Sequence, residues 1–221
     1  MGAEGFEPPR VLPLAVVLRG RRCLVVGGGQ RAARRAAELV SAGATVCVVA
    51  PVLSAALAAL VRGGRTVSWR ARRFEPGDVD GAHLVVAATS DPSVDQQVFE
   101  EAEARGTWVH CPDDPGRCSV YAMALVHRGP VTVAVSTAGS SPALASYLRG
   151  WLDTRLDVAL GDVAIVLSEV RRELLDEGAS TEGRAWHDVV DDELVAMVGA
   201  GRPDAARSRV RDAVRRASGE P

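Results

Sequence analysis

The sequence predicts an α/β fold in which a doubly wound parallel sheet precedes a small α+β segment and a helical C-terminal region. Three observations support this expectation. Short apolar runs alternate with helical patterns through the first half of the chain, which is typical of a parallel sheet covered on both faces. A glycine-rich turn joins the first apolar run to the first helical pattern. Beyond residue 154, only helical spacing remains.

The glycine-rich turn carries the strongest functional signal. Gly27, Gly29 and Ala32 fit the G-x-G-x-x-G/A pattern of Rossmann-like dinucleotide-binding domains. Gly27 allows the tight turn, Gly29 leaves room for a pyrophosphate, and Ala32 lets the helix pack closely on the strand. The N–H groups at the helix start face a bound phosphate, which the positive end of the helix dipole favours. Taken alone, the pattern also fits a plain glycine turn.

The elements around this turn favour the dinucleotide interpretation. Strands are expected at 23–26, 45–49, 66–71, 83–88 and 107–111, and helices at 31–41, 54–61 and 91–105. The first strand, the first helix and the second strand complete a βαβ unit of the usual length. Pro92 suits the first turn of the third helix, because no N–H is needed there. Residues 1–10 lack periodicity and are expected to form a loose tail.

The pattern changes after the fifth strand. Residues 119–127 are apolar and ambiguous between helix and strand, whereas residues 131–136 alternate as a strand. Ser140–Pro142 then opens a helix that continues to Asp153. Further helices are expected around the apolar stripes at 163–174 and 186–198, and over 207–217. The expected segments are therefore a dinucleotide-binding domain at 1–117, a small segment at 118–153 and a helical region at 154–221.

Composition narrows the function classes. A net charge of −2 over 221 residues, with a pI near 6.1, argues against a dedicated nucleic-acid binder. All 26 basic residues are arginine, whose guanidinium fork binds carboxylates, so the chain is well supplied for an acidic ligand. The apolar stretch at 11–18 is too short to span a membrane. Cys23 and Cys47 fall in core strands as free thiols. These features predict a reduced, cytoplasmic enzyme with no membrane partner.

Polar residues gather where the expected strands end, which is the edge at which doubly wound sheets bind ligands. The second strand ends at 49–51 without the acid that usually holds an NAD ribose. Three arginines between 70 and 73 lie too far along the chain to be assigned to a 2′-phosphate. Thr89 and Ser90 follow the fourth strand, where they either touch the cofactor or simply turn the chain and cap the next helix.

The fifth strand is followed by His110 and two adjacent carboxylates, Asp113 and Asp114. This group suits proton transfer, although an ordinary Asp-Pro turn has the same composition. A metal site built from the histidines and cysteines between 110 and 127 would match no common ligand spacing, and no metal is expected. The loop Ser136–Pro142 offers hydroxyl and N–H groups at a helix start, which suits either carboxylate binding or a plain cap.

Dispersed motifs occur in a fixed order along residues 11–153. They are Leu12–Leu14, Leu18–Gly20, Val25–Gly29, Arg34–Ala36, Val48–Pro51, Ala87–Thr89, Asp113–Pro115, Arg128–Pro130, Val133–Thr137 and Ser141–Ala145. Together they resemble the siroheme synthase N-terminal domain family. Members of this family are precorrin-2 dehydrogenases, and some also act as sirohydrochlorin ferrochelatases. The resemblance implies NAD as cofactor, a tetrapyrrole as substrate, and a homodimer built partly through residues 118–153.

Carried over by position, the resemblance implies roles for individual residues. The family's catalytic aspartate aligns with Asp113, which becomes the expected general base. The resemblance places cofactor contacts at Gln30, Arg31, Pro51 and Val52. The glycine turn and the end of the fourth strand add Gly27, Gly29 and Thr89. The expected substrate contacts are Ser136, Thr137 and Arg128, and Arg117 and Arg149 are further candidates for the substrate's carboxylates.

The expected function is NAD-dependent dehydrogenation of precorrin-2 to sirohydrochlorin in siroheme biosynthesis. Insertion of Fe²⁺ or Co²⁺ would be a second activity, which the motifs do not decide. The chain departs from the family at His110–Pro112, where members often carry Asn-Val-Val, and residues 154–221 are only loosely similar. An alternative from another class is a non-catalytic NAD(H)-sensing regulatory module, which would need the glycine turn but not Asp113.

Overall fold

The computed structural model describes residues 9–64, 66–179 and 185–218. The chain folds into two compact units. The first extends to Ala122 and includes Ala138–Ser140, and the second comprises Met123–Thr137 and the chain from Ser141 onward. Most of the expected loose tail, residues 1–8, lies outside the described residues. The expected division at 117 and 153 stays a prediction.

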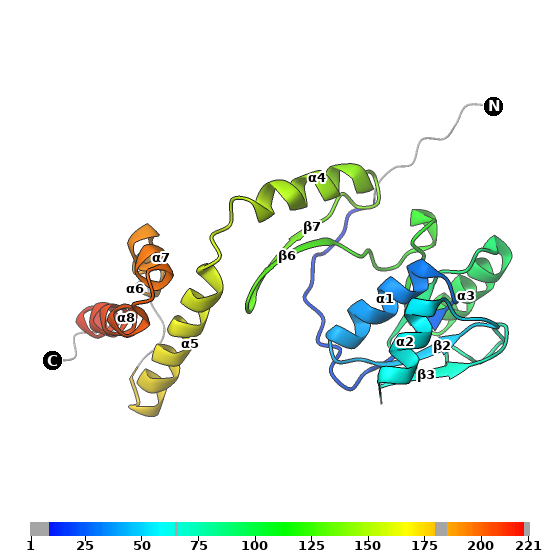
Figure 1. Cartoon of the computed structure of the whole chain (residues 1–221), viewed down its shortest axis with the longest axis horizontal. Helices are drawn as coiled ribbons and strands as arrows, with labels where there is room; N and C mark the ends of the chain where they lie inside the picture. Colours follow the sequence, from blue (N-terminus) through cyan, green and yellow to red (C-terminus); the bar gives the residue numbers. More distant parts are fainter. Residues whose placement is uncertain (1–8, 65, 180–184, 219–221) are drawn as a thin grey trace. The chain divides into compact units, whose positions relative to one another are not determined.

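A five-stranded parallel sheet forms the centre of the first unit (Figure 1). Its strands are β1 (Arg22–Val26), β2 (Thr45–Val49), β3 (Val67–Arg70), β4 (Leu84–Ala87) and β5 (Trp108–His110). Their order is β3-β2-β1-β4-β5, and every neighbouring pair is parallel. The chain runs outward from β1 to β3 and then crosses to the other side of β1. The predicted α/β fold with a doubly wound sheet is confirmed.

Helices cover both faces of this sheet. They are α1 (Gln30–Ser41), α2 (Ala55–Gly63) and α3 (Pro92–Ala104). Successive strand residues point to opposite faces, so Cys23 and Val25 of β1 pack with α1 and α2. Leu24 and Val26 pack on the other face, with α3. The two faces therefore hold separate apolar layers, and Cys23 behaves as a small core residue, as predicted.

Side-chain caps set where two of these helices begin. Ser54 accepts a hydrogen bond from the Leu57 N–H at 3.4 Å, and Asp91 accepts one from the Ser93 N–H at 3.0 Å. Both cap residues have extended backbone angles, so α2 and α3 each begin one residue later than the sequence pattern predicts. Pro92 occupies the first turn of α3, as expected.

The second unit begins with an antiparallel hairpin of β6 (Ala124–Arg128) and β7 (Val131–Val135), followed by α4 (Pro142–Asp153). The ambiguous apolar stretch at 119–127 is therefore a strand from Ala124 onward. The hairpin turn contacts the start of a later helix, α5 (Leu160–Asp176), closely: a Cβ on Gly161 would lie 2.8 Å from the Arg128 carbonyl oxygen. Ser141 caps α4, because its hydroxyl accepts a hydrogen bond from the Leu144 N–H.

The described residues from Leu160 onward form helices, as predicted. These helices are α5 (Leu160–Asp176), α6 (Ala185–Asp188), α7 (Asp192–Gly199) and α8 (Pro203–Ser218). The apolar stripe expected over 186–198 divides into two helices because Asp191 caps α7 by accepting from the Leu194 N–H at 2.9 Å. Residues of all four helices share one core, which includes Val170, Leu194 and Val210. In the described part of the chain, no helix has the length and apolar character that a membrane crossing needs.

Candidate active site

A cavity of about 1180 Å³ lies at the carboxyl edge of the five-stranded sheet. The segments that follow β1, β2, β4 and β5 line it, together with the residues just beyond β3. The strand order reverses between β1 and β4, and doubly wound sheets bind their ligands outside this point. The position of the cavity therefore follows from the topology of the sheet.

The three glycines after β1 have three different surroundings in this cavity. A Cβ on Gly27 would lie 2.2 Å from the Ala88 carbonyl oxygen, and the residue has φ +124°. A Cβ on Gly28 would lie 1.8 Å from the Val52 carbonyl oxygen. A Cβ on Gly29 would meet nothing within 4 Å. The chain itself requires the first two glycines, whereas only a ligand gives a reason for the third.

The start of α1 is suited to an anion. Gly29 is its N-cap and provides no side-chain hydrogen bond, and the first turn carries no acidic residue. Gln30 and Arg31 of that turn line the cavity. A helix start without a side-chain cap leaves its N–H groups for a phosphate, and the open space at Gly29 lets a pyrophosphate approach. These residues fit the phosphates of a dinucleotide.

The segment after β2 forms a second wall. The Gly27 N–H donates to the Val49 carbonyl at 3.0 Å, and the Ser54 N–H donates to the Gly28 carbonyl at 2.7 Å. These bonds hold the glycine turn against residues 49–54. Pro51 and Val52 line the cavity, and the Val52 side chain is 75% exposed. No acid is present at this wall, as the sequence indicates.

Thr89 is tied into the turn after β4. Its hydroxyl donates to the Asp95 carboxylate at 2.8 Å and accepts from the Asp91 N–H at 3.1 Å, and its own N–H donates to Asp95 at 3.2 Å. Asp95 is 9% exposed and lines the cavity. This buried carboxylate was not among the residues expected from the sequence. Its signal is its place on the buried stripe of α3, one turn before Val98.

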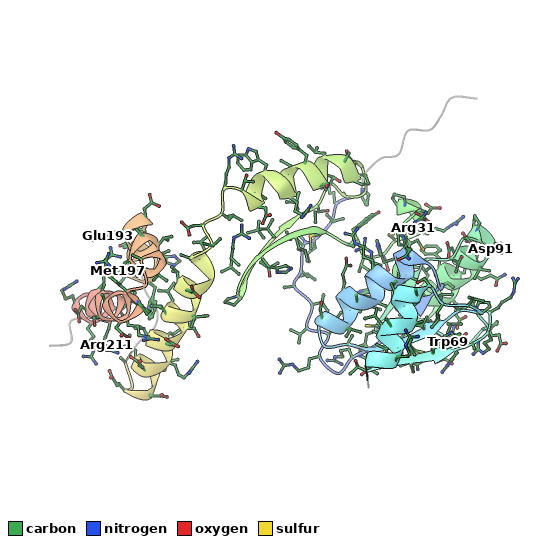
Figure 2. The ribbon with its side chains drawn as sticks, in the orientation of Figure 1. Arg31, Trp69, Asp91, Glu193, Met197 and Arg211 are labelled. Carbon is green, nitrogen blue, oxygen red and sulfur yellow. The ribbon has the colours of Figure 1, made fainter. Side chains whose placement is uncertain are left out.

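The two carboxylates after β5 differ in what holds them. Asp114 caps the short 3₁₀ turn Pro115–Arg117 by accepting from the Gly116 N–H at 2.9 Å, and it lies 3.4 Å from Arg117. Asp113 instead pairs with the Arg31 guanidinium at the start of α1, and both side chains are more than half exposed. Figure 2 labels Arg31 at this helix start. Asp113 is therefore the carboxylate without a structural task in its own loop.

His110 lies beneath α1 rather than in the cavity. Burial, together with the charge of Arg35, lowers the pKa of His110 to about 4, so the imidazole is neutral at neutral pH. Its Nδ1 lies 3.3 Å from the Val120 carbonyl, and its Nε2 has no partner among the described residues. The Cys118 Sγ bonds the backbone N–H and carbonyl of Cys111, both at 3.2 Å. The side chains of His110 and Cys118 stabilise the loop that carries Asp113.

The expected substrate residues of the second unit are engaged in local bonds. Arg128 donates to the Asp153 carboxylate at 3.0 Å and to the Leu156 carbonyl at 3.2 Å, which fastens the hairpin to the end of α4. The Thr137 hydroxyl donates to the Ser141 carbonyl at 3.1 Å. Ser136 follows β7 and is exposed. The roles of these residues as substrate contacts stay predictions.

Comparison with known proteins identifies the family. Residues 14–124 match the family described as "Putative NAD(P)-binding", and residues 128–152 match the "Sirohaem biosynthesis protein central" family. The chain belongs to the siroheme synthase N-terminal domain family. This membership confirms the predicted resemblance and the predicted cofactor, NAD.

Individual relatives agree with this membership. The chain is 39% identical over 198 residues to a siroheme synthase of Methylobacillus flagellatus, and over 199 residues to siroheme synthase 1 of Cronobacter sakazakii. Each alignment covers 89% of this chain and 42% of the relative, so the chain spans about two fifths of these siroheme synthases. The solved structure of SirC, a precorrin-2 dehydrogenase, superposes with a TM-score of 0.74 at 21% identity, over 91% of this chain and 100% of SirC. That likeness shows the fold.

Proposed function

We propose that this chain oxidises precorrin-2 to sirohydrochlorin with NAD⁺ as the acceptor. One observation carries the proposal: the open space at Gly29 and the carboxylate of Asp113 line the same cavity, from the ends of β1 and β5. A dinucleotide site and a candidate base thus share one cleft. The siroheme synthase relatives supply the substrate class.

In this proposal the first unit binds the cofactor and moves the proton. Bound NAD⁺ supplies the hydride acceptor. The α1 N–H groups, Gln30 and Arg31 bind the pyrophosphate, while Pro51 and Val52 flank the adenosine half. The turn fixed by Thr89 borders the cleft on the β4 side. Dehydrogenation removes a hydride and a proton from the substrate, and an Asp113 carboxylate oxygen accepts the proton.

The Arg31–Asp113 pair joins the cofactor and base regions of the cleft. An exposed ion pair contributes about 0–1 kcal/mol, so a bound pyrophosphate can draw Arg31 away at little cost. Asp113 then faces the substrate with both carboxylate oxygens available. Arg117, which also lines the cleft, is a candidate for a substrate carboxylate, as are Arg128 and Arg149.

The proposal extends to assembly and location. We propose a homodimer formed partly through the hairpin and α4, because large apolar side chains there are exposed. A cytoplasmic location is also proposed, on the support of four free cysteines. Insertion of Fe²⁺ or Co²⁺ as a substrate would use Asp113 to remove pyrrole protons. Among the described residues, no group of three or more His, Cys, Asp or Glu side chains is placed to hold a metal ion.

Incubation of the purified chain with precorrin-2, with and without NAD⁺, tests the proposal. The expected result is sirohydrochlorin only when NAD⁺ is present. Failure to convert precorrin-2 by a protein that still binds NAD⁺ would favour the non-catalytic NAD(H)-sensing module. A parallel sample with added Fe²⁺ separates metal insertion from dehydrogenation.

A further inference from the structure

The charges around the cleft are distributed unevenly. Four acidic residues line it, and all of them follow β4 or β5: Asp91, Asp95, Asp113 and Asp114. The segments that follow β2 and β3 contribute a single charged residue, Arg73. In sheets of this topology, the ribose of the adenosine half lies near the end of β2. The adenosine side of this cleft is therefore positive.

The ends of β2 and β3 are fixed to one another. The Trp69 indole N–H donates to the Ala50 carbonyl at 2.8 Å, and the Ala50 N–H donates to the Arg70 carbonyl at 3.3 Å. Arg73 follows β3 by three residues and so lies at the carboxyl edge of the sheet, beside the end of β2. From the sequence alone, this arginine lies too far along the chain to be assigned to a 2′-phosphate, because only the structure shows that β3 pairs with β2.

The neighbouring arginines have structural tasks that Arg73 lacks. Arg70 and Arg72 both bond Asp78, which is 2% exposed, at 2.5 Å and 2.7 Å. Burial raises the pKa of Asp78, but hydrogen bonds from Arg72, the Glu75 N–H and Arg70 outweigh it and hold the pKa below its usual value. Arg72 also donates to the Arg73 carbonyl at 2.9 Å. This cluster anchors the backbone that carries Arg73.

The guanidinium of Arg73 remains available. It is exposed, and it forms no ion pair among the residues that the structure describes. Asp91, which also lines the cleft, caps α3. Hydrogen bonds from the Ser93 hydroxyl and N–H are the main causes of the lowered Asp91 pKa, and the charge of Arg73 is the smallest cause. Figure 2 shows Asp91 at the start of α3.

We propose that the cleft accepts a 2′-phosphorylated dinucleotide, NADP⁺, as well as NAD⁺, and that Arg73 binds the 2′-phosphate. Two features act together. An acid at the end of β2 normally bonds the ribose 2′-hydroxyl and repels a 2′-phosphate, and residues 49–54 contain none. A guanidinium on an anchored backbone offers two parallel N–H donors to phosphate oxygens. The inference rests on the proposed dinucleotide site at the glycine turn.

Calorimetric titration of the purified chain with NAD⁺ and NADP⁺ tests this inference without any turnover. The parent chain is expected to bind the two dinucleotides with dissociation constants within about threefold. Arg73→Ser is expected to weaken NADP⁺ about tenfold, as the loss of a charge-assisted bond predicts, and to change NAD⁺ less than twofold. Arg73→Lys should restore part of the difference. Arg62→Ser, which removes an exposed arginine from the last turn of α2, is the matched control.

A second variant tests whether the absence of an acid at the end of β2 allows NADP⁺ to bind. Pro51→Asp places a carboxylate at the end of β2 and is expected to weaken NADP⁺ about tenfold relative to NAD⁺. Rejection of NADP⁺ by a parent chain that binds NAD⁺ would overturn the inference and leave the proposed function standing. Equal weakening of both dinucleotides by Arg73→Ser would also overturn it. Failure of the parent chain to bind either one would overturn the inference together with the proposed cofactor site.

Discussion

In the turn after β1, the fold requires Gly28, whereas only the proposed ligand requires Gly29. Gly29→Val adds a branched side chain where the structure has open space, so folding should be unaffected. The same side chain occupies the position proposed for the pyrophosphate. We expect the dissociation constant for NAD⁺ to rise by at least about a hundredfold, on the order of 3 kcal/mol, in a calorimetric titration.

Gly28→Ala provides the contrasting variant. A Cβ at this position would overlap the Val52 carbonyl, so the substitution should lower the free energy of unfolding measured in urea. Unchanged NAD⁺ affinity in a folded Gly29→Val protein would place the cofactor elsewhere. Unchanged stability in Gly28→Ala would mean that the turn is looser than the structure indicates.

The two carboxylates after β5 offer a second matched pair. Asp113→Ala should lower the turnover of precorrin-2 by roughly 10²–10⁴-fold, the usual span for general acid–base catalysis, and leave NAD⁺ binding intact. Asp114→Ala removes the cap of the 3₁₀ turn and should cost about 1 kcal/mol of stability. Steady-state kinetics and urea unfolding separate the two effects. Near-full turnover in Asp113→Ala would show that Asp113 is not the general base.

Local chemistry explains which site residues the sequence could indicate. The roles of Gly27 and Ala32 follow from spacing, because a strand, a turn and a helix are local. The buried stripe of α3 also marks Asp95, although its bond to Thr89 is seen only in the structure. Arg73 and His110 could not be found this way, because their surroundings come from the pairing of β3 with β2 and from the charged residues of α1. The environment of each of these two depends on residues distant in the chain.

At the scale of elements, the burial of His110 at the end of β5 predicts a pH effect. His110 has a pKa of about 4 in the folded chain and about 6.5 when unfolded, so the unfolded state binds more protons between these values. Stability should therefore fall as the pH falls from 6.5 to 4, by up to about 1.4 kcal/mol per pH unit. Urea unfolding of the parent chain and of His110→Gln, at intervals across this range, measures the effect.

The variant isolates the contribution of the imidazole. His110→Gln should flatten the pH dependence in this window, and a comparison above pH 7 reports the change in packing alone. Equal slopes for the variant and the parent chain would show that other groups carry the acid sensitivity. Asp78, whose pKa is held low by its arginines, should contribute only as the pH falls further.

The boundaries of the elements show which of them hydrophobic periodicity can predict. The parallel strands of the first unit were predictable to within one or two residues. The reason is clearest for β1, β2 and β4, where buried apolar side chains run continuously. The stretch at 119–127 could not be assigned, since pairing with β7 decides it. The break between α6 and α7 depends on a single cap at Asp191. The apolar stripe over 186–198 continues across this break, so hydrophobic periodicity alone does not predict it.

At the scale of the whole molecule, the second unit exposes more apolar surface than its own helices cover. Large exposed side chains of the hairpin, α4 and α5 include Leu125, Leu144, Tyr147, Trp151 and Ile165. No residue of α4 is buried. Exposed apolar side chains in such number are typical of a protein interface. We expect light scattering to give twice the chain mass of 23.2 kDa.

A charge on this face should dissociate the dimer. Tyr147 is 67% exposed, so Tyr147→Glu should leave the fold intact and give a monomer at micromolar concentration. Leu175→Glu, at a 54% exposed position near the end of α5, is the control and should remain dimeric. A parent chain that is monomeric under the same conditions would contradict the proposed assembly.

The most direct test of dehydrogenation in this cleft is a single turnover of precorrin-2 by excess purified chain under anaerobic conditions, with NAD⁺ as the added acceptor. We expect one NADH to form for each sirohydrochlorin, at equal rates, with both signals lost in Asp113→Ala. Sirohydrochlorin formed without NADH, or no product from a protein shown to bind NAD⁺, would contradict the claim that this cleft is the site of the dehydrogenation.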